Sequence, residues 1–165
     1  KLAITQKIRL GIYGTSKYKI EVGRIWGTLP YTYLELHNGN ETYFFSDDAY
    51  NLMNYYEFAS DQYISVFWEH HFEGVFFNKV PLFKKLMLRE VVGAKGVYGK
   101  LSDKHNSELI IPETTFSLEE PYIEVAVGIE NIMTMLRVDA IWRLTHYDNP
   151  NVTQFGVRVK LQPGF

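Results

Sequence analysis

The side chains with the clearest potential for chemistry are two glutamates that flank a histidine. Glu69, His71 and Glu73 alternate along the chain, so on a β-strand all three would face the same side. Two carboxylates beside an imidazole could act as an acid/base group. A network of ion pairs gathers the same residue types, and we favour that interpretation. His70 would face the opposite side from His71, which argues against a metal ion shared by the two histidines.

Opposite charges recur on the polar positions of several other stretches. We predict that they form ion pairs inside the protein, with Arg89, Arg137 and Arg158 pairing with carboxylates rather than binding a ligand. The residues concerned are Arg89, Arg137, Asp139, Arg158, Glu69 and Glu124. The sequence contains no cysteine, so disulfides, thiolate nucleophiles and Cys-ligated zinc are excluded. We therefore predict a protein with no catalytic site, no metal and no cofactor.

A run of polar residues makes the best candidate for a functional loop: His37, Asn38, Gly39, Asn40, Glu41 and Thr42. Its residue types suit a tight turn at Gly39 and supply several hydrogen-bond donors and acceptors. The run lies within residues 28–61, where the regular pattern of the chain breaks. A loop of that length is usually functional or carries its own structure.

The elements that would position these residues are β-strands, because apolar and polar residues alternate strictly along most of the chain. Seven strands are predicted, and the first two should form a hairpin. They cover residues 2–14, 17–27, 62–72, 86–99, 123–130, 136–145 and 155–165. An eighth strand could lie within 50–58. We expect residues 1–165 to form a single all-β, antiparallel barrel segment of about 7–8 strands.

Alternation gives each strand one apolar face, which could line a protein core or contact lipid. Strands of about 10 residues suit a tilted bilayer span, and aromatic residues near strand ends suit interfacial girdles. With a net charge of -2, the chain has no positive electrostatic field that would attract nucleic acid. It also lacks the 18-residue apolar run of a transmembrane helix. We favour a transmembrane β-barrel; a soluble lipocalin-like barrel that binds an apolar ligand is the alternative, and an enzyme using Glu69, His71 and Glu73 comes third.

If the strands span a membrane, their apolar residues face outward to lipid, and the last strand could serve as an assembly signal. We expect eight residues to face outward: Ile8, Leu10, Ile20, Val66, Leu88, Val125, Val138 and Val157. The last strand alternates to a terminal aromatic residue, which resembles the signal by which bacterial outer-membrane barrels are recognised for assembly. That signal would consist of Phe155, Val157, Val159, Leu161 and Phe165. A last amphipathic strand without a signalling role is the simpler alternative.

Several stretches resemble the C-terminal barrel of a Bacteroidota outer-membrane family of unknown function. They comprise residues 27–31, 35–43, 50–58, 69–74, 78–86 and 88–92. Members of that family carry a carboxypeptidase-regulatory-like domain before the barrel. Residues 127–129 and 136–140 more distantly resemble the penultimate strands of BamA-type surface-antigen barrels, which insert or translocate other outer-membrane proteins. In those proteins a long loop folds into the lumen, which implies that role for His37–Thr42; a plain extracellular turn is the alternative.

Together these observations predict a location and a role. We expect the C-terminal strands of a larger barrel, or a small closed barrel, in the bacterial outer membrane. Its partners would be the lipid bilayer and other outer-membrane or periplasmic proteins, in a non-enzymatic assembly, translocation or transport function. Seven strands are an odd number, whereas bacterial single-chain barrels use even numbers. We therefore expect a fragment of a longer chain, in which the first and last strands do not pair.

Overall fold

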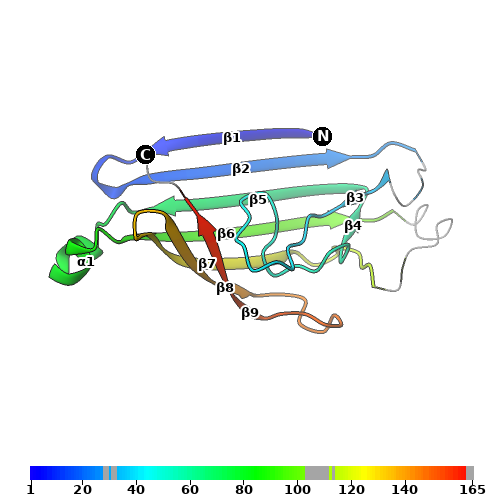
Figure 1. Ribbon diagram of the computed structural model, residues 1–165. Helices are drawn as coiled ribbons and strands as arrows, with labels where there is room; N and C mark the ends of the chain where they lie inside the picture. The colour runs from blue at the N-terminus through cyan, green and yellow to red at the C-terminus, as the bar shows by residue number, and fades with distance from the viewer. Residues whose placement is uncertain (28–29, 31–32, 103–111, 113, 163–165) are drawn as a thin grey trace.

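A computed structural model describes residues 1–27, 30, 33–102, 112 and 114–162 (Figure 1). The chain is all-β and antiparallel, as predicted, and its main element is a sheet of seven strands. In sheet order these strands are β1 (Leu2–Arg9), β2 (Thr15–Arg24), β5 (Gln62–His71), β6 (Arg89–Lys100), β7 (Tyr122–Ile132), β8 (Leu136–Arg143) and β9 (Phe155–Leu161).

The smaller elements lie in the connections between these strands. A two-stranded sheet pairs β3 (Glu35–Leu36) with β4 (Ala59–Ser60). Short helices are η1 (Gly11–Tyr13), η3 (Phe77–Lys79) and α1 (Pro81–Lys85). None of the helices in the described residues is long and apolar enough to cross a bilayer.

The seven-stranded sheet does not close on itself. Each strand pairs with the next in sheet order, and β1 and β9 form the two edges. The prediction that the first and last strands do not pair is therefore confirmed. The two edges differ. Phe44, in the connection between β3 and β4, forms a parallel bridge to Val159 of β9, whereas every residue of β1 is exposed.

The strand boundaries shift where the backbone turns sharply. The first strand ends at Arg9, before Gly11 and Gly14 adopt positive φ angles of 61° and 97°. Both values lie in the left-handed region that favours glycine, so this stretch is a turn and not the end of a strand. The fourth long strand begins at Arg89 and not at residue 86, because Leu86 caps the end of α1 and Met87 has a positive φ of 52°.

The possible eighth strand within 50–58 is not a strand. In place of one, residues 37–58 lie across one face of the main sheet as a folded loop, between β3 and β4 (Figure 1). We call this segment the inner loop, the sheet face beneath it the covered face, and the opposite face the open face.

The two sheet faces carry opposite kinds of side chain. Along β7, Glu124, Ala126 and Gly128 are buried on the covered face, while Ile123, Val127 and Ile129 are exposed on the open face. Of the eight residues expected to face outward, six lie on strands and point to the open face, while Leu10 and Leu88 lie just outside β1 and β6. Ile8, Leu10, Ile20, Val66 and Val157 are exposed, whereas Leu88, Val125 and Val138 are half-buried.

Candidate functional site on the covered face

The inner loop is held on the covered face first by aromatic packing. The ring of Tyr50 lies 5.0 Å from the ring of Phe67 and 5.4 Å from that of Tyr122. Met53 and Phe58 join the same buried cluster. Because an aromatic side chain contributes a large apolar area, this cluster fixes the loop against strands β5 and β7.

Glu124 anchors the backbone of the inner loop at its centre. Its two carboxylate oxygens accept the backbone N–H groups of Asn51, at 2.8 Å, and Leu52, at 3.0 Å. The hydroxyl of Tyr122 donates to the same carboxylate at 3.0 Å. A buried carboxylate requires several donors of this kind, so Glu124 both holds the loop and depends on it.

A buried ion pair fixes the far end of the inner loop. The guanidinium of Arg143 on β8 donates to both oxygens of Glu57, at 2.6 and 3.1 Å. Asn149 and the backbone N–H of Asn54 also donate to Glu57, each at 2.9 Å. Arg143 and Glu57 are both buried, and this two-pronged geometry is the strongest form of an arginine–carboxylate contact.

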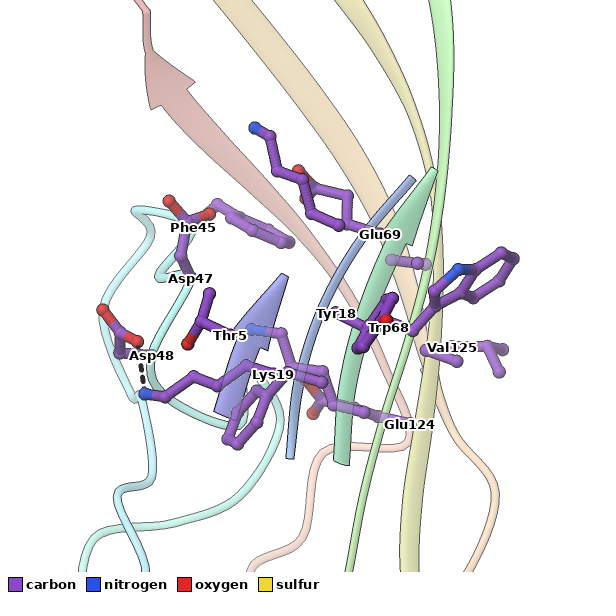
Figure 2. A pocket seen from close by; sticks show the side chains of 16 residues that line it. Thr5, Tyr18, Lys19, Phe45, Asp47, Asp48, Trp68, Glu69, Glu124 and Val125 are labelled. Carbon is purple, nitrogen blue, oxygen red and sulfur yellow. Dashed lines mark hydrogen bonds and ion pairs between the residues drawn. The ribbon is translucent and has the colours of Figure 1, made fainter. Parts of the chain in front are cut away.

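Lysine side chains hold the remaining side of the loop. Lys95 of β6 donates to the carbonyl oxygens of Ser46 and Ala49, at 2.5 and 2.6 Å. At the exposed rim, Lys160 pairs with Asp47 at 2.6 Å and Lys19 pairs with Asp48 at 2.8 Å. Figure 2 shows Phe45, Asp47 and Asp48 facing the covered side of the strands, while Trp68 and Val125 point away from it. The space between loop and strands is thus a hollow crossed by charged contacts.

A second charged cluster lies beside the inner loop. His71 contacts Glu69 at 2.6 Å and Glu130 at 2.9 Å, so both of its ring nitrogens are engaged. Glu69 also pairs with Arg137 at 2.8 Å, and Arg137 in turn pairs with Asp139 at 2.8 Å. These contacts link β5, β7 and β8 in one continuous chain of charges.

The acid/base arrangement of Glu69, His71 and Glu73 does not assemble as a triad. Glu73 lies beyond the end of β5, is exposed, and has a positive φ of 54°, which breaks the alternation. Its carboxylate accepts the hydroxyl of Thr15 at 3.0 Å. His70 faces the open side, as expected, and its ring contacts the carbonyl oxygen of Tyr13 at 3.0 Å. Within the described residues, no group of three or more His, Cys, Asp and Glu side chains could hold a metal ion.

The predicted ion pairs form in part. Arg137 contacts Glu69 and Asp139 as expected. The prediction is wrong for the other two arginines, neither of which pairs with Glu69, Glu124 or Asp139 in the part of the chain described. Arg89 is exposed at the beginning of β6, and Arg158 donates to the carbonyl oxygen of Asn51 at 3.0 Å. The Glu124 carboxylate instead accepts hydrogen bonds from the backbone of the inner loop.

The candidate run His37–Thr42 lies at the beginning of the inner loop and acts as its internal frame. Asn40 donates to Asn51 at 2.8 Å and accepts the backbone N–H of Thr42 at 3.0 Å, while Asn38 accepts the N–H of Tyr50 at 2.8 Å. Glu41 accepts the N–H of Tyr55 at 2.9 Å. Gly39 is needed for a close approach rather than for a turn, since a Cβ there would clash with the carbonyl oxygens of Met53 and Asn54.

His37 is the buried titratable group of this run. Its Nε2 lies 2.9 Å from the hydroxyl oxygen of Ser60, and its ring meets that of Tyr63 edge-on at 5.0 Å. Burial disfavours the charged imidazolium and lowers the pKa of His37 to about 4. The imidazole is therefore neutral at neutral pH.

Four residues of the predicted assembly signal, Phe155, Val157, Val159 and Leu161, lie on β9 and share the open face. Phe155, Val157 and Leu161 are exposed there, and Val159 is half-buried. The backbone of Val159 donates to Tyr43 at 3.0 Å and accepts from Phe45 at 2.9 Å. Phe165 lies outside the described residues.

The residues that sequence reasoning missed are those that join loop and sheet: Glu57, Arg143, Lys95, Asn51, Asp47 and Asp48. Arg143 and Lys95 were visible as polar positions of alternating strands. Nothing local distinguishes them from lysines and arginines in contact with water, because their partners lie on the loop, far away in sequence.

A protein-family model matches the N-terminal part of the chain. The model described as "Family of unknown function (DUF5686) C-terminal domain" matches residues 1–111. The chain belongs to this family. Neither a curated protein nor a solved structure matches it.

The match to the DUF5686 C-terminal domain covers β1 to β6 and the whole inner loop. It therefore includes the loop's own anchors, such as Glu57, and Lys95 on the sheet. The partners Glu124, Arg137 and Arg143 come from β7 and β8, beyond the matched residues.

Proposed function

We propose that this chain is the C-terminal part of a transmembrane β-barrel in the outer membrane of Bacteroidota. Its role is non-enzymatic, in the assembly, translocation or transport of other molecules, and its partners are the bilayer and other outer-membrane or periplasmic proteins. The distant resemblance to BamA-type barrels favours assembly or translocation. No nucleic acid takes part.

The observation that carries this proposal is the inverted distribution of side chains between the two sheet faces. Exposed apolar residues follow the open face from edge to edge, including Ile4, Val22, Ile64, Val127 and Val157. Removing one such side chain from water is worth about 1.5–3 kcal/mol, so a face of this extent calls for an apolar environment. Lipid supplies that environment, and the alternation of lipid-facing and inward residues is typical of outer-membrane strands.

The same distribution disfavours the lipocalin-like alternative. A soluble barrel that binds an apolar ligand would present apolar side chains inward. Here the covered face carries Arg137, Asp139 and Arg143 in buried contacts, and the inner loop occupies it. The uncovered edge of β1 also favours a larger barrel, because unpaired backbone groups are strongly unfavourable in hydrocarbon.

The experiment is purification with and without detergent, followed by size-exclusion chromatography with light scattering. We expect the protein to require detergent or lipid to stay dispersed, and to refold into phospholipid vesicles. A monodisperse monomer in plain buffer, with no bound detergent belt when detergent is added, would overturn the proposal and favour the soluble alternative.

A second measurement separates transport from assembly. Because the inner loop covers the polar face, a conducting path along that face requires the loop to move. We expect little conductance from the wild-type protein in planar bilayers, and more from Arg143→Met, which leaves the Glu57 carboxylate without its cation and loosens the loop. Stepwise conductance in the wild type would favour transport, whereas silence in both proteins would favour assembly or translocation.

A further inference from the structure

The connection between β5 and β6 departs from the others at its end of the sheet. The turns there are short, at 10–14 and 133–135, while the opposite end carries the long connections 25–61, 101–121 and 144–154. Outer-membrane barrels have short periplasmic turns and longer extracellular loops. Residues 72–88 are the long exception at the short-turn end, and they contain η3 and α1 (Figure 1).

This segment is a folded element tied to the sheet. The rings of Phe77 and Phe83 pack 4.8 Å apart and join η3 to α1. The carboxylate of Glu90 on β6 accepts the backbone N–H of Phe77, and Asn131 donates to the carbonyl oxygen of Met87 at 2.7 Å. Its position relative to β6 and β7 is therefore fixed by contacts.

A row of rings connects the segment to the open face of the sheet. Trp68 and His70 on β5 stack with centroids 6.3 Å apart, His70 meets Phe72 at 4.4 Å, and Phe72 meets Phe76 at 5.3 Å. The apolar open face thus continues without a break into residues 72–76.

The outer surface of the segment combines apolar and cationic side chains. Its large exposed apolar residues are Phe76, Val80, Leu82, Leu86 and Met87, which range from 43% to 61% exposed. Between residues 76 and 89 the sequence has four cations, Lys79, Lys84, Lys85 and Arg89, and no acidic residue. Apolar side chains beside lysines, in a stretch of sequence that has no carboxylate of its own, are complementary to a surface of anionic lipid headgroups.

We propose that residues 76–88 form an interfacial anchor that inserts Leu82 and its apolar neighbours among the lipids of the periplasmic leaflet. Lys79, Lys84 and Lys85 contact the lipid phosphates and give a preference for anionic phospholipid over zwitterionic phospholipid. This inference rests on the proposed function, since it takes the open face as the lipid-facing one.

The test uses single cysteines, which the cysteine-free sequence makes unambiguous. Leu82→Cys in the anchor and Val125→Cys on the open face are labelled with bimane in the 165-residue chain. The labelled proteins are refolded into phosphatidylcholine vesicles with or without one-third phosphatidylglycerol. Brominated lipid and aqueous iodide then compete as quenchers. The charge variant K79Q/K84Q/K85Q is compared with K7Q/K17Q/K100Q, which removes three exposed lysines elsewhere.

We expect the label at residue 82 to be quenched several-fold more by brominated lipid than by iodide when phosphatidylglycerol is present. K79Q/K84Q/K85Q should lose at least half of that preference, and K7Q/K17Q/K100Q should keep it. If residue 125 is quenched by lipid while residue 82 is quenched by iodide, the anchor is refuted and the barrel stands. The headgroup preference is refuted if lipid quenching at residue 82 is the same with and without phosphatidylglycerol and is unchanged in K79Q/K84Q/K85Q. Iodide quenching at 125 refutes the proposed function itself.

Discussion

The covered face of the sheet holds buried charges such as Arg143 and Asp139, whereas the open face holds Ile64, Val66 and Val127 exposed. In a water-soluble sheet protein the apolar face packs against a core and the charged face meets solvent. Here the charged face is closed by the inner loop and the apolar face is left uncovered. The inner loop therefore supplies hydrogen-bond and ion-pair partners to the polar side chains of the sheet. The apolar side chains of the open face need an apolar environment from outside the chain.

The largest effect should come from breaking the Arg143–Glu57 pair on the covered face. Arg143→Met leaves the Glu57 carboxylate buried without its cation, which typically costs about 3–5 kcal/mol. Urea-induced unfolding in vesicles measures this loss. Adding Glu57→Gln removes the orphaned charge and should recover part of the stability. A loss below about 1 kcal/mol for Arg143→Met would show that the pair does not hold the loop.

A charge placed in the middle of the open face should have the next largest effect. Val66 lies in mid-strand on β5 between Ile20 and Gly96, and Val66→Arg should cost about 2–4 kcal/mol if this face meets hydrocarbon. Thr153→Arg, exposed in the connection before β9, is the matched control and should cost little. Equal and small effects of the two changes on refolding into vesicles would contradict the lipid-facing assignment.

Lowering the pH should loosen the inner loop through His37. An unfolded histidine has a pKa of about 6.5, whereas burial lowers the pKa of His37 to about 4, so below pH 6.5 the unfolded chain takes up a proton that the folded chain refuses. Stability is full above pH 6.5 and falls as the pH drops towards 4. Between pH 7 and pH 5 this group should remove about 2 kcal/mol.

Unfolding free energies measured across that pH range check the contribution of His37. His37→Gln should flatten the slope between pH 7 and pH 5, whatever it does to the stability at pH 7. A slope identical to that of the wild type would place the titrating group elsewhere.

The smallest effect should come from the rim of the loop. Lys160 and Asp47 pair at 2.6 Å, but the Asp47 side chain is 57% exposed, so water competes with the contact. Asp47→Asn should cost about 0–1 kcal/mol in the same unfolding assay. A cost comparable to that of Arg143→Met would show that the rim, and not the buried pair, fixes the loop.

The sequence predicts the strands well because alternation is a local property. The seven strands and the faces of Ile20, Val66 and Val157 all follow from a period of two. The turns and the helix α1 were less predictable, since five residues are too few to show a helical period.

The site was predicted less completely, because its contacts join residues distant in sequence. Arg137 and Asp139 lie two positions apart on one strand, so their pairing followed from the pattern. Arg143 and Glu57 lie 86 residues apart, and only the path of the inner loop brings them together. Arg89 was misassigned because its strand begins at that residue, where the side chain is exposed.

The most direct measurement of the central claim is the accessibility of nitroxide labels along β7 in vesicles. Single cysteines at Ile123, Val125, Val127 and Ala126 carry the label, and collisions with oxygen, which dissolves in lipid, are compared with collisions with a water-soluble nickel chelate. We predict high oxygen and low nickel collision rates at positions 123, 125 and 127, and low rates with both at position 126. Nickel collisions at the odd positions as frequent as at a labelled Thr153→Cys would contradict a lipid-facing open face.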